Sequence, residues 1–288
     1  MNEPDKLLNL RVCVVGLGLM GGSMAMALRG KCASLIGVDC DHRVLTLACQ
    51  LNLVDQCYES IGDSLNEADL IILATPVGVI LEYLRNLPGF TENSVIVLDL
   101  GSTKVEITQA MQSLPKCYDP LGGHPMCGKE QSSLKNANRD LFLGAPFALT
   151  CLDRTSARAR DLAVQIIQTI GANPIWINPD THDHWVAATS HLPYLVANTL
   201  AFITPLESKP LVSTGFRSTT RLAATPPSII LDILISNQVN ILSGLGEYRK
   251  QLEILEEKLR SHDFESVKDL LCTGASKYEE LIVSKIPS

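Results

Sequence analysis

The sequence is short of positive charge, of long apolar runs and of secretion signals. Its 24 lysines and arginines are outnumbered by 31 aspartates and glutamates, which gives a formal net charge of −7. That balance argues against nucleic acid or an anionic membrane as the main partner. No apolar run approaches the roughly 18–20 residues of a membrane span. The start, MNEPDKLLNL, has no basic stretch followed by an apolar core. We therefore expect no nucleic-acid partner, no membrane partner and no signal peptide.

Disulfide motifs are also missing. The nine cysteines are odd in number and include no CxxC pair. Several lie in apolar, strand-like stretches, where a thiol behaves as a small hydrophobic group. This pattern predicts a reduced, cytoplasmic protein and argues against a disulfide scaffold. With 46% hydrophobic and 19% charged residues among 288, the chain has the composition of a well-packed globular protein.

The first half of the chain alternates short apolar runs with segments of helical length. Continuous apolar strands that alternate with helices predict a parallel sheet covered on both faces. The expected strands are 10–15, 35–38, 70–74, 95–98, 147–150 and 174–177. The expected helices between them are 23–29, 44–51, 77–87 and 156–170.

After residue 178 the strand pattern stops. Asn178 and Pro179 have the residue types of an N-cap and of the first helical position. Helices are expected over 180–203, 228–260 and 264–284. We therefore expect an α/β domain over residues 1–178 and an all-α domain over residues 179–288. A helical unit of this kind often forms a dimer, so a homodimer is expected.

The first expected strand runs directly into the glycine pattern GLGLMG at residues 16–21, which a helix follows. Gly16 permits a tight turn, Gly18 lets the backbone approach a pyrophosphate, and Gly21 allows close contact between helix and strand. The phosphates would lie at the helix N-terminus, where N–H groups and the helix dipole favour negative charge. The pattern is weak alone, but in this context it predicts a Rossmann-type dinucleotide-binding domain.

Asp39 ends the second expected strand, 23 residues after Gly16. An acid about 20 residues after the glycines binds the ribose 2′-hydroxyl, and it would repel a 2′-phosphate. NAD is therefore favoured, although His42 and Arg43 leave NADP possible. The residues expected to bind the cofactor are Gly16, Gly18, Leu19, Met20, Gly21, Asp39, Thr75 and Pro76.

Polar residues follow further strands, and ligands of open α/β sheets bind outside the carboxyl ends of strands. Ser102 follows such a strand; its alternative role is the N-cap of the next helix, with Lys104 merely exposed. The stretch GGHPMCG at 122–128 cannot be a helix and is too glycine-rich for an ordinary strand. Its His124 should emerge at the same edge of the sheet, where imidazole is suited to accept a proton near neutral pH.

Two segments of the helical half also carry candidate residues. SHLP at 190–193 places a proline inside a helix, which bends it. Residues 213–221, which include GFRSTTR at 215–221, are expected to form a polar loop whose two arginines suit the binding of carboxylates. A group formed by His182, His184 and His191 has no carboxylate or cysteine at a recognised ligand spacing, so no metal is expected.

Taken together, these segments resemble one family, the prephenate and arogenate dehydrogenases of tyrosine biosynthesis. The resemblance rests on GLGLMGGS at 16–23, DLGSTK at 99–104, GGHPMCG at 122–128, SHLP at 190–193 and GFRSTTR at 215–221. They occur in the family's order and span most of the chain. The resemblance implies a nucleotide-binding domain and a helical dimerisation domain. It also implies NAD(P)-dependent oxidative decarboxylation of a small anionic cyclohexadienyl alcohol, giving 4-hydroxyphenylpyruvate or tyrosine.

The resemblance also assigns roles to residues. His124 would accept the proton of the ring hydroxyl, and Ser102 would hold that hydroxyl and orient the imidazole. Arg221 would bind a substrate carboxylate, and His191 would support substrate binding. The secondary candidates for the substrate site are Arg217, Glu130 and Lys104.

Other functions stay open at this point. A Rossmann-domain dehydrogenase of the 3-hydroxyacid dehydrogenase or imine reductase type begins with the same glycine pattern, but GGHPMCG and GFRSTTR are not expected in it. A non-catalytic dinucleotide-binding sensor would need the glycines and Asp39 without His124. Prephenate and arogenate are not distinguished by these residues. Because the chain ends soon after its helices, we expect any inhibition by tyrosine to act at the active site.

Overall fold

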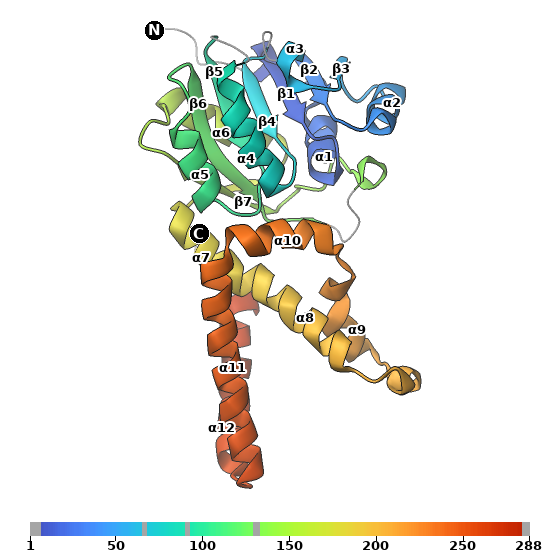
Figure 1. The fold of residues 1–288 in the computed structure, drawn as a ribbon, viewed down its shortest axis with the longest axis vertical. Coiled ribbons are helices and arrows are strands. Elements are labelled where there is room, and N and C mark those ends of the chain that lie inside the picture. The colour runs from blue at the N-terminus through green and yellow to red at the C-terminus, as the bar shows by residue number, and fades with distance from the viewer. Residues whose placement is uncertain (1–6, 65–67, 90–92, 129–132, 284–288) are drawn as a thin grey trace. The chain divides into compact units, whose positions relative to one another are not determined.

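The computed structural model describes residues 7–64, 68–89, 93–128 and 133–283. The fold contains an eight-stranded sheet with the order β3-β2-β1-β4-β5-β6-β7-β8 (Figure 1). Neighbouring strands are parallel, except that β7 runs antiparallel to β6. This arrangement confirms the expected Rossmann-type sheet followed by helices.

The strands are β1 (Arg11–Val15), β2 (Ser34–Val38), β3 (Gln56–Tyr58), β4 (Leu70–Leu73), β5 (Val95–Asp99), β6 (Tyr118–Pro125), β7 (Pro146–Cys151) and β8 (Asn173–Trp176). The helices among them are α1 (Leu19–Leu28), α2 (His42–Gln50), α3 (Ile61–Ser64), α4 (Val77–Asn86), α5 (Val105–Gln112) and α6 (Ala157–Thr169). The later helices are α7 (Pro179–Val186), α8 (Leu192–Ile203), α9 (Thr214–Thr220), α10 (Pro227–Ser236), α11 (Gln238–Arg260) and α12 (Phe264–Tyr278).

The sheet is buried on both faces because successive side chains of a strand point to opposite sides. In β1, Val12 and Val14 pack into the core beneath α1, α2 and α6. Cys13 and Val15 pack into the opposite core beneath α3, α4 and α5. The short apolar runs of the sequence are therefore explained by a sheet with no solvent-facing side.

The stretch around His124 differs from our expectation, because it lies in a central strand. Residues 118–125 form β6, which pairs with β5 on one side and β7 on the other. A Cβ atom at Gly122 would lie 2.0 Å from Oγ1 of Thr150, and one at Gly123 would lie 2.7 Å from the carbonyl oxygen of Asp99. The glycines are thus what allows a strand at this crowded place. His124 nevertheless lies near the carboxyl end of β6, as expected.

The segment 213–221 was expected to be a loop, and this is wrong. Its residues form α9, which continues into a 3-10 turn that begins at Arg221. Ser218 and Thr220 donate their hydroxyl hydrogens to carbonyl oxygens three and four residues earlier in the same helix. Such local bonds satisfy polar side chains within a helix, so polarity alone does not indicate a loop. Similarly, the helix expected over 228–260 is interrupted at Asn237, between α10 and α11.

Residues 179–203 form one helical segment with an irregular centre. A π-helical turn at Ala187–His191 separates α7 from α8, directly before Pro193. Proline has no N–H to donate, and a π-turn is a common way to accommodate an interrupted helix. The segment is long and apolar enough to match a membrane span by length and composition. Its first turns, however, carry two buried polar side chains: His182 bonds to His124 on β6, and Asp183 accepts the N–H groups at the start of α5.

The chain divides into two compact units, residues 1–238 and 239–288. The first holds the sheet and every helix up to α10. The second consists of most of α11 together with α12, joined by a turn in which Asp263 accepts the N–H of Ser266 and pairs with Lys258. The expected boundary between an α/β domain (1–178) and an all-α domain (179–288) falls in the turn between β8 and α7. This division into domains stays a prediction.

Candidate active site

A cradle for a dinucleotide forms where β1 meets α1. Gly16 has a φ of +89°, and a Cβ atom there would lie 2.6 Å from the side chain of Thr75. A Cβ atom at Gly21 would lie 1.8 Å from the carbonyl oxygen of Gly16. At Gly18, by contrast, nothing lies within 4 Å of that position. The turn is therefore tight on its protein side and open at Gly18, beside the N-terminus of α1, as a bound pyrophosphate requires.

Asp39 lies at the end of β2, facing this turn. Its carboxylate accepts the N–H of Leu17 at 2.8 Å and the N–H of Asp41 at 2.9 Å. These bonds hold the acid beside the glycine turn, where a ribose hydroxyl would lie. Arg43 donates to Asp41 at 2.8 Å and is exposed, so its guanidinium is engaged away from Asp39. The local arrangement favours a 2′-hydroxyl over a 2′-phosphate.

A cavity of about 320 Å³ continues from the cradle. It is lined by Gly18, Leu19, Met20, Thr75, Pro76 and Ser102, among others. Five of these are expected cofactor residues, and they come from two different βα loops, so the fold brings them together at one edge of the sheet. Within the described chain, the buried Oγ1 of Thr75 has no hydrogen-bond partner. A buried hydroxyl in this condition is suited to a ligand, because buried polar groups are normally paired.

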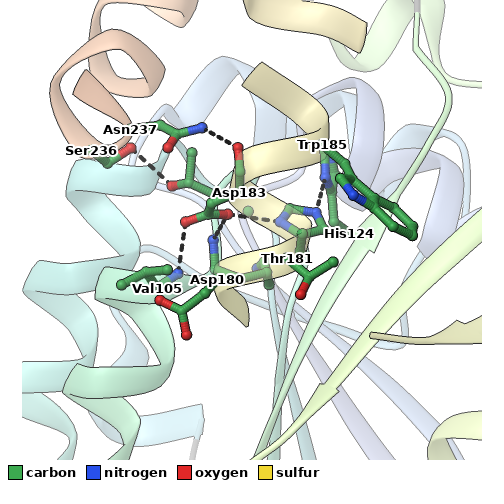
Figure 2. Close-up of polar contacts among 12 residues, drawn as sticks. Val105, His124, Asp180, Thr181, Asp183, Trp185, Ser236 and Asn237 are labelled. Atoms are coloured by element: carbon green, nitrogen blue, oxygen red, sulfur yellow. Dashed lines mark hydrogen bonds and ion pairs between the residues drawn. The ribbon is translucent and has the colours of Figure 1, made fainter. Parts of the chain in front are cut away.

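Ser102 lies just after β5, half-buried and in the wall of this cavity. It is not the N-cap of α5, which was its alternative role. The first N–H groups of that helix, those of Lys104 and Val105, donate instead to Asp183 at 2.7 and 2.9 Å (Figure 2). Because a residue from α7 satisfies this helix end, the Ser102 hydroxyl is left beside the cofactor cavity.

Lys104 was a secondary candidate for binding the substrate, but its side chain has no exposed surface and does not reach a ligand. Its ammonium pairs with Asp99, which is also fully buried. Burial raises the pKa of Asp99 and lowers that of Lys104, since each charged form loses its hydration, whereas the contact between them favours the charged forms. Asp99 also accepts the N–H groups of Gly101 and Gly123. The pair therefore holds the loop that carries Ser102 against β6, the strand that carries His124.

His124 is linked to two residues of α7. Its Nδ1 lies 2.9 Å from Nε2 of His182, and Nδ1 of His182 lies 2.7 Å from Oδ1 of Asp183. The two imidazole rings meet edge to face, with centroids 5.1 Å apart. His182 and Asp183 are buried, whereas His124 is half-buried and lines a second cavity. The imidazole of His124 is thus held by His182 at one nitrogen, while another part of the residue lines the second cavity.

This environment keeps His124 uncharged. Burial lowers its pKa well below 6.5, and His182, Lys104 and His191 lower it further because each disfavours another positive charge nearby. A neutral imidazole at pH 7 has one bare nitrogen and is able to accept a proton.

His191 lies at the end of the π-turn and is 3% exposed. Its Nδ1 lies 3.3 Å from the amide nitrogen of Asn237, which also donates to the carbonyl oxygen of Asp183. Burial lowers the pKa of His191 to about 4, so the ring is neutral at pH 7. Because an amide nitrogen is a donor, Nδ1 accepts and the ring hydrogen lies on Nε2. Within the described residues this Nε2 has no partner, which leaves one donor for a bound group.

The second cavity, of about 370 Å³, brings Arg221 to the same space as His124. Gly128 lines both cavities, which places the two spaces side by side. Arg217, about one turn earlier on α9, is exposed and does not line this cavity. Glu130, a secondary candidate, lies outside the described residues. A larger cavity of about 640 Å³ runs along α6 and β8 at the outer side of the sheet, and it contains none of the expected site residues.

Sequence reasoning missed three residues of this site. His182 was considered only as a metal ligand, and neither Asp183 nor Asn237 was singled out. His182 and Asp183 lie on α7, Asn237 caps the end of α10, and all three are polar residues that are buried. That pattern is the available signal in the sequence, since a buried polar group needs a partner. Their partners, however, come from segments 46 to 79 residues away.

Comparison with known proteins gives a consistent result over residues 24–176 and 178–273. Residues 24–176 match the family model described as prephenate dehydrogenase, nucleotide-binding domain, and residues 178–273 match prephenate dehydrogenase, dimerization domain. The chain is 31% identical to a prephenate dehydrogenase of Bacillus subtilis over 268 residues, which cover 89% of this chain and 72% of that protein.

Solved structures agree. The prephenate dehydrogenase of Aquifex aeolicus in complex with hydroxyphenyl propionate and NAD+ has a TM-score of 0.88 at 27% identity, covering 96% of this chain and all of that one. Synechocystis arogenate dehydrogenase has a TM-score of 0.79 at 28% identity, covering 95% of this chain and all of that one.

Replacing Lys104 by Met is expected to destabilise the fold by about 3–5 kcal/mol, because it leaves the Asp99 carboxylate buried without its counter-charge. Denaturant unfolding monitored by circular dichroism measures this change. The double variant Asp99→Asn/Lys104→Met removes both charges and keeps an acceptor for one of the two backbone N–H groups. It should be more stable than the single variant. A single variant as stable as the parent chain would show that the pair is not an energetic link.

Proposed function

The chain belongs to the prephenate dehydrogenase family, and we propose that it oxidises and decarboxylates prephenate or arogenate with NAD. The observation that carries this proposal is the meeting of two cavities at the carboxyl edge of the sheet. One is the dinucleotide cradle that ends at Ser102, and the other contains His124 and Arg221. A hydroxyl, a neutral imidazole and a guanidinium beside a cofactor site suit an anionic alcohol.

The cofactor site fits NAD on the evidence of this chain's own atoms. Gly18 offers an open backbone position, the buried Thr75 hydroxyl has no partner in the described chain, and Asp39 is held where the ribose would lie. When bound, NAD supplies the acceptor for the hydride that leaves the alcohol carbon. Asp39 sets the preference for NAD over NADP, because its carboxylate would repel a 2′-phosphate.

His124 acts as the general base. As the substrate's hydroxyl carbon is oxidised, the hydroxyl proton moves to a bare nitrogen of the neutral imidazole. The ring carboxylate is then lost as carbon dioxide, and the ring becomes aromatic. Aromatisation provides the thermodynamic drive, so the protein's task is to position the substrate and accept one proton.

The remaining residues bind and orient. Ser102 holds the substrate hydroxyl between the cofactor site and His124, and Arg221 binds a substrate carboxylate. His191 presents its Nε2–H to a polar group of the substrate, consistent with the buried donor that has no partner in the described chain. Arg217 and Glu130 are secondary candidates, and Lys104 supports the site from beneath through Asp99.

The protein is proposed to act as a homodimer in the cytoplasm. The match of residues 178–273 to a dimerization domain supports the dimer. Large apolar side chains of the helical half are exposed in the single chain, among them Phe202, Leu206 and Leu211. All nine cysteines lie in the described residues and none of them forms a disulfide there, which supports a reducing compartment.

A spectrophotometric assay tests the proposed function. We expect NADH to form with prephenate, with arogenate or with both, and kcat/KM to be higher with NAD than with NADP. Parallel kcat/KM measurements identify the preferred substrate. Binding of NAD without turnover of either compound would contradict the proposal and favour a sensor, and a clear preference for NADP would contradict the role of Asp39.

The pH dependence and the variant His124→Asn test the base. The base must be neutral, and its pKa lies below 6.5, so kcat/KM should stay level from pH 7 to 6.5 and fall only at more acidic pH. Asn keeps a polar group near His182 but lacks the imidazole nitrogen that accepts the proton. We expect kcat to fall by roughly 10²–10⁴-fold, with the Kd for NAD unchanged. A variant with kcat near that of the parent chain would remove His124 from the mechanism.

The arginines form a matched pair of variants. Arg221→Ala should raise the substrate KM about 10-fold or more, because a charge-assisted bond to a carboxylate is lost. Arg217→Ala removes the same charge one turn away, outside the cavity, and should change KM less. Initial-rate kinetics at saturating NAD measures both. Equal effects of the two substitutions would indicate a general electrostatic attraction and not a specific contact.

A further inference from the structure

His182 has no role in the proposed reaction, although it touches the proposed base. Its side chain is 2% exposed and bridges His124 and Asp183 through its two ring nitrogens. A buried imidazole in this position decides which nitrogen of its neighbour carries the proton, because the tautomer of one ring is set by the bond that its other nitrogen makes.

The direction of the chain of bonds is set at Asp183. Its Oδ1 accepts the N–H of Lys104 at 2.7 Å, and its Oδ2 accepts the N–H of Val105 at 2.9 Å. Backbone N–H groups only donate, so the carboxylate is an acceptor at both oxygens. Figure 2 shows Asp183 between this helix end and the ring that leads to His124. Oδ1 therefore also accepts from Nδ1 of His182, which must carry a hydrogen.

The same logic carries on to His124. With its hydrogen on Nδ1, a neutral His182 has a bare Nε2 that accepts a bond. Nδ1 of His124, 2.9 Å away, must then be the donor. Nε2 of His124 is left bare. The opposite tautomer of His124 would set two bare nitrogens against each other in a buried place, which costs the desolvation of both.

We propose that His182, held by Asp183, is a positioning residue that keeps the hydrogen of His124 on Nδ1 and leaves Nε2 free to accept the substrate proton. This inference rests on the proposed function and adds to it the nitrogen that acts. When His124 accepts the proton, the Asp183 carboxylate lies behind His182 and offsets the developing positive charge. The cationic Lys104 and the neighbouring His191 do not provide such an offset.

Two substitutions at residue 182 separate positioning from simple packing. His182→Leu fills the space but has no acceptor for Nδ1–H of His124. His182→Gln retains an acceptor oxygen at the same distance along the side chain, together with a donor for Asp183. In the full-length protein we expect His182→Leu to lower kcat about 100-fold, with the substrate KM and the Kd for NAD within about twofold of the parent values. His182→Gln should recover most of that loss.

The tautomer is read directly by ¹⁵N nuclear magnetic resonance of protein labelled at its six histidines. The signals of His124 are identified by their loss in His124→Asn. We expect a protonated Nδ1 and a bare Nε2 for His124 in the parent protein and in His182→Gln, and a mixture of tautomers in His182→Leu. Melting temperatures show whether each variant is folded.

Three results would overturn the proposal: a protonated Nε2 in the parent protein, an unchanged tautomer in His182→Leu, or an unchanged kcat in that variant. If His182→Leu does not fold, the parent spectrum and His182→Gln still decide the question. The spectrum needs no substrate, so it also separates the two hypotheses. Absence of turnover with both substrates would reject the proposed function while leaving the tautomer measurable.

Discussion

The carboxylate of Asp183 is the contact on which the arrangement of the site depends. It satisfies the first two N–H groups of α5 and, through His182, fixes the position of His124. One side chain of α7 thus connects the helical segment to the N-terminus of α5 and, through His182, to β6. Helix N-termini have unsatisfied donors and a partial positive charge, so a buried carboxylate is stable there without a further counter-ion.

A second buried acid, Asp99 at the end of β5, also holds parts of the site together. Asp99 receives the ammonium of Lys104 and the N–H groups of Gly101 and Gly123. Two buried charges are costly to desolvate, and in proteins generally the replacement of such a pair by apolar residues is often neutral or stabilising. The function of the pair is to position residues of the site. Its contacts hold the loop that carries Ser102 and the strand β6, which carries His124. The candidate site is therefore supported by two buried carboxylates, those of Asp99 and Asp183, that line neither cavity.

Features of the fold were predictable from the sequence where they depend on residues that are close together in the chain, and less so where they depend on distant residues. The GLGLMG turn and Asp39 were predictable because a strand, a turn and a helix that are neighbours in sequence create the site. β6 was not recognised, because Gly122 and Gly123 are unfavourable in a strand unless neighbouring chains crowd it, and the crowding atoms belong to Asp99 and Thr150. A loop was expected over residues 213–221 because their side chains are polar. In the structure these side chains bond to carbonyl oxygens of the same helix, so the segment is helical.

The sequence by itself determined the alternation of strands and helices, the dinucleotide turn and the identity of the family, because these depend on local periodicity and on motifs in a given order. It also indicated His124, Ser102 and Arg221 as a set. Only the tertiary structure decided that Lys104 is buried against Asp99 and that His182 and Asp183 stand behind His124. The physical reason is that burial and hydrogen bonding join residues tens of positions apart, and no local pattern records which distant group will satisfy a buried charge.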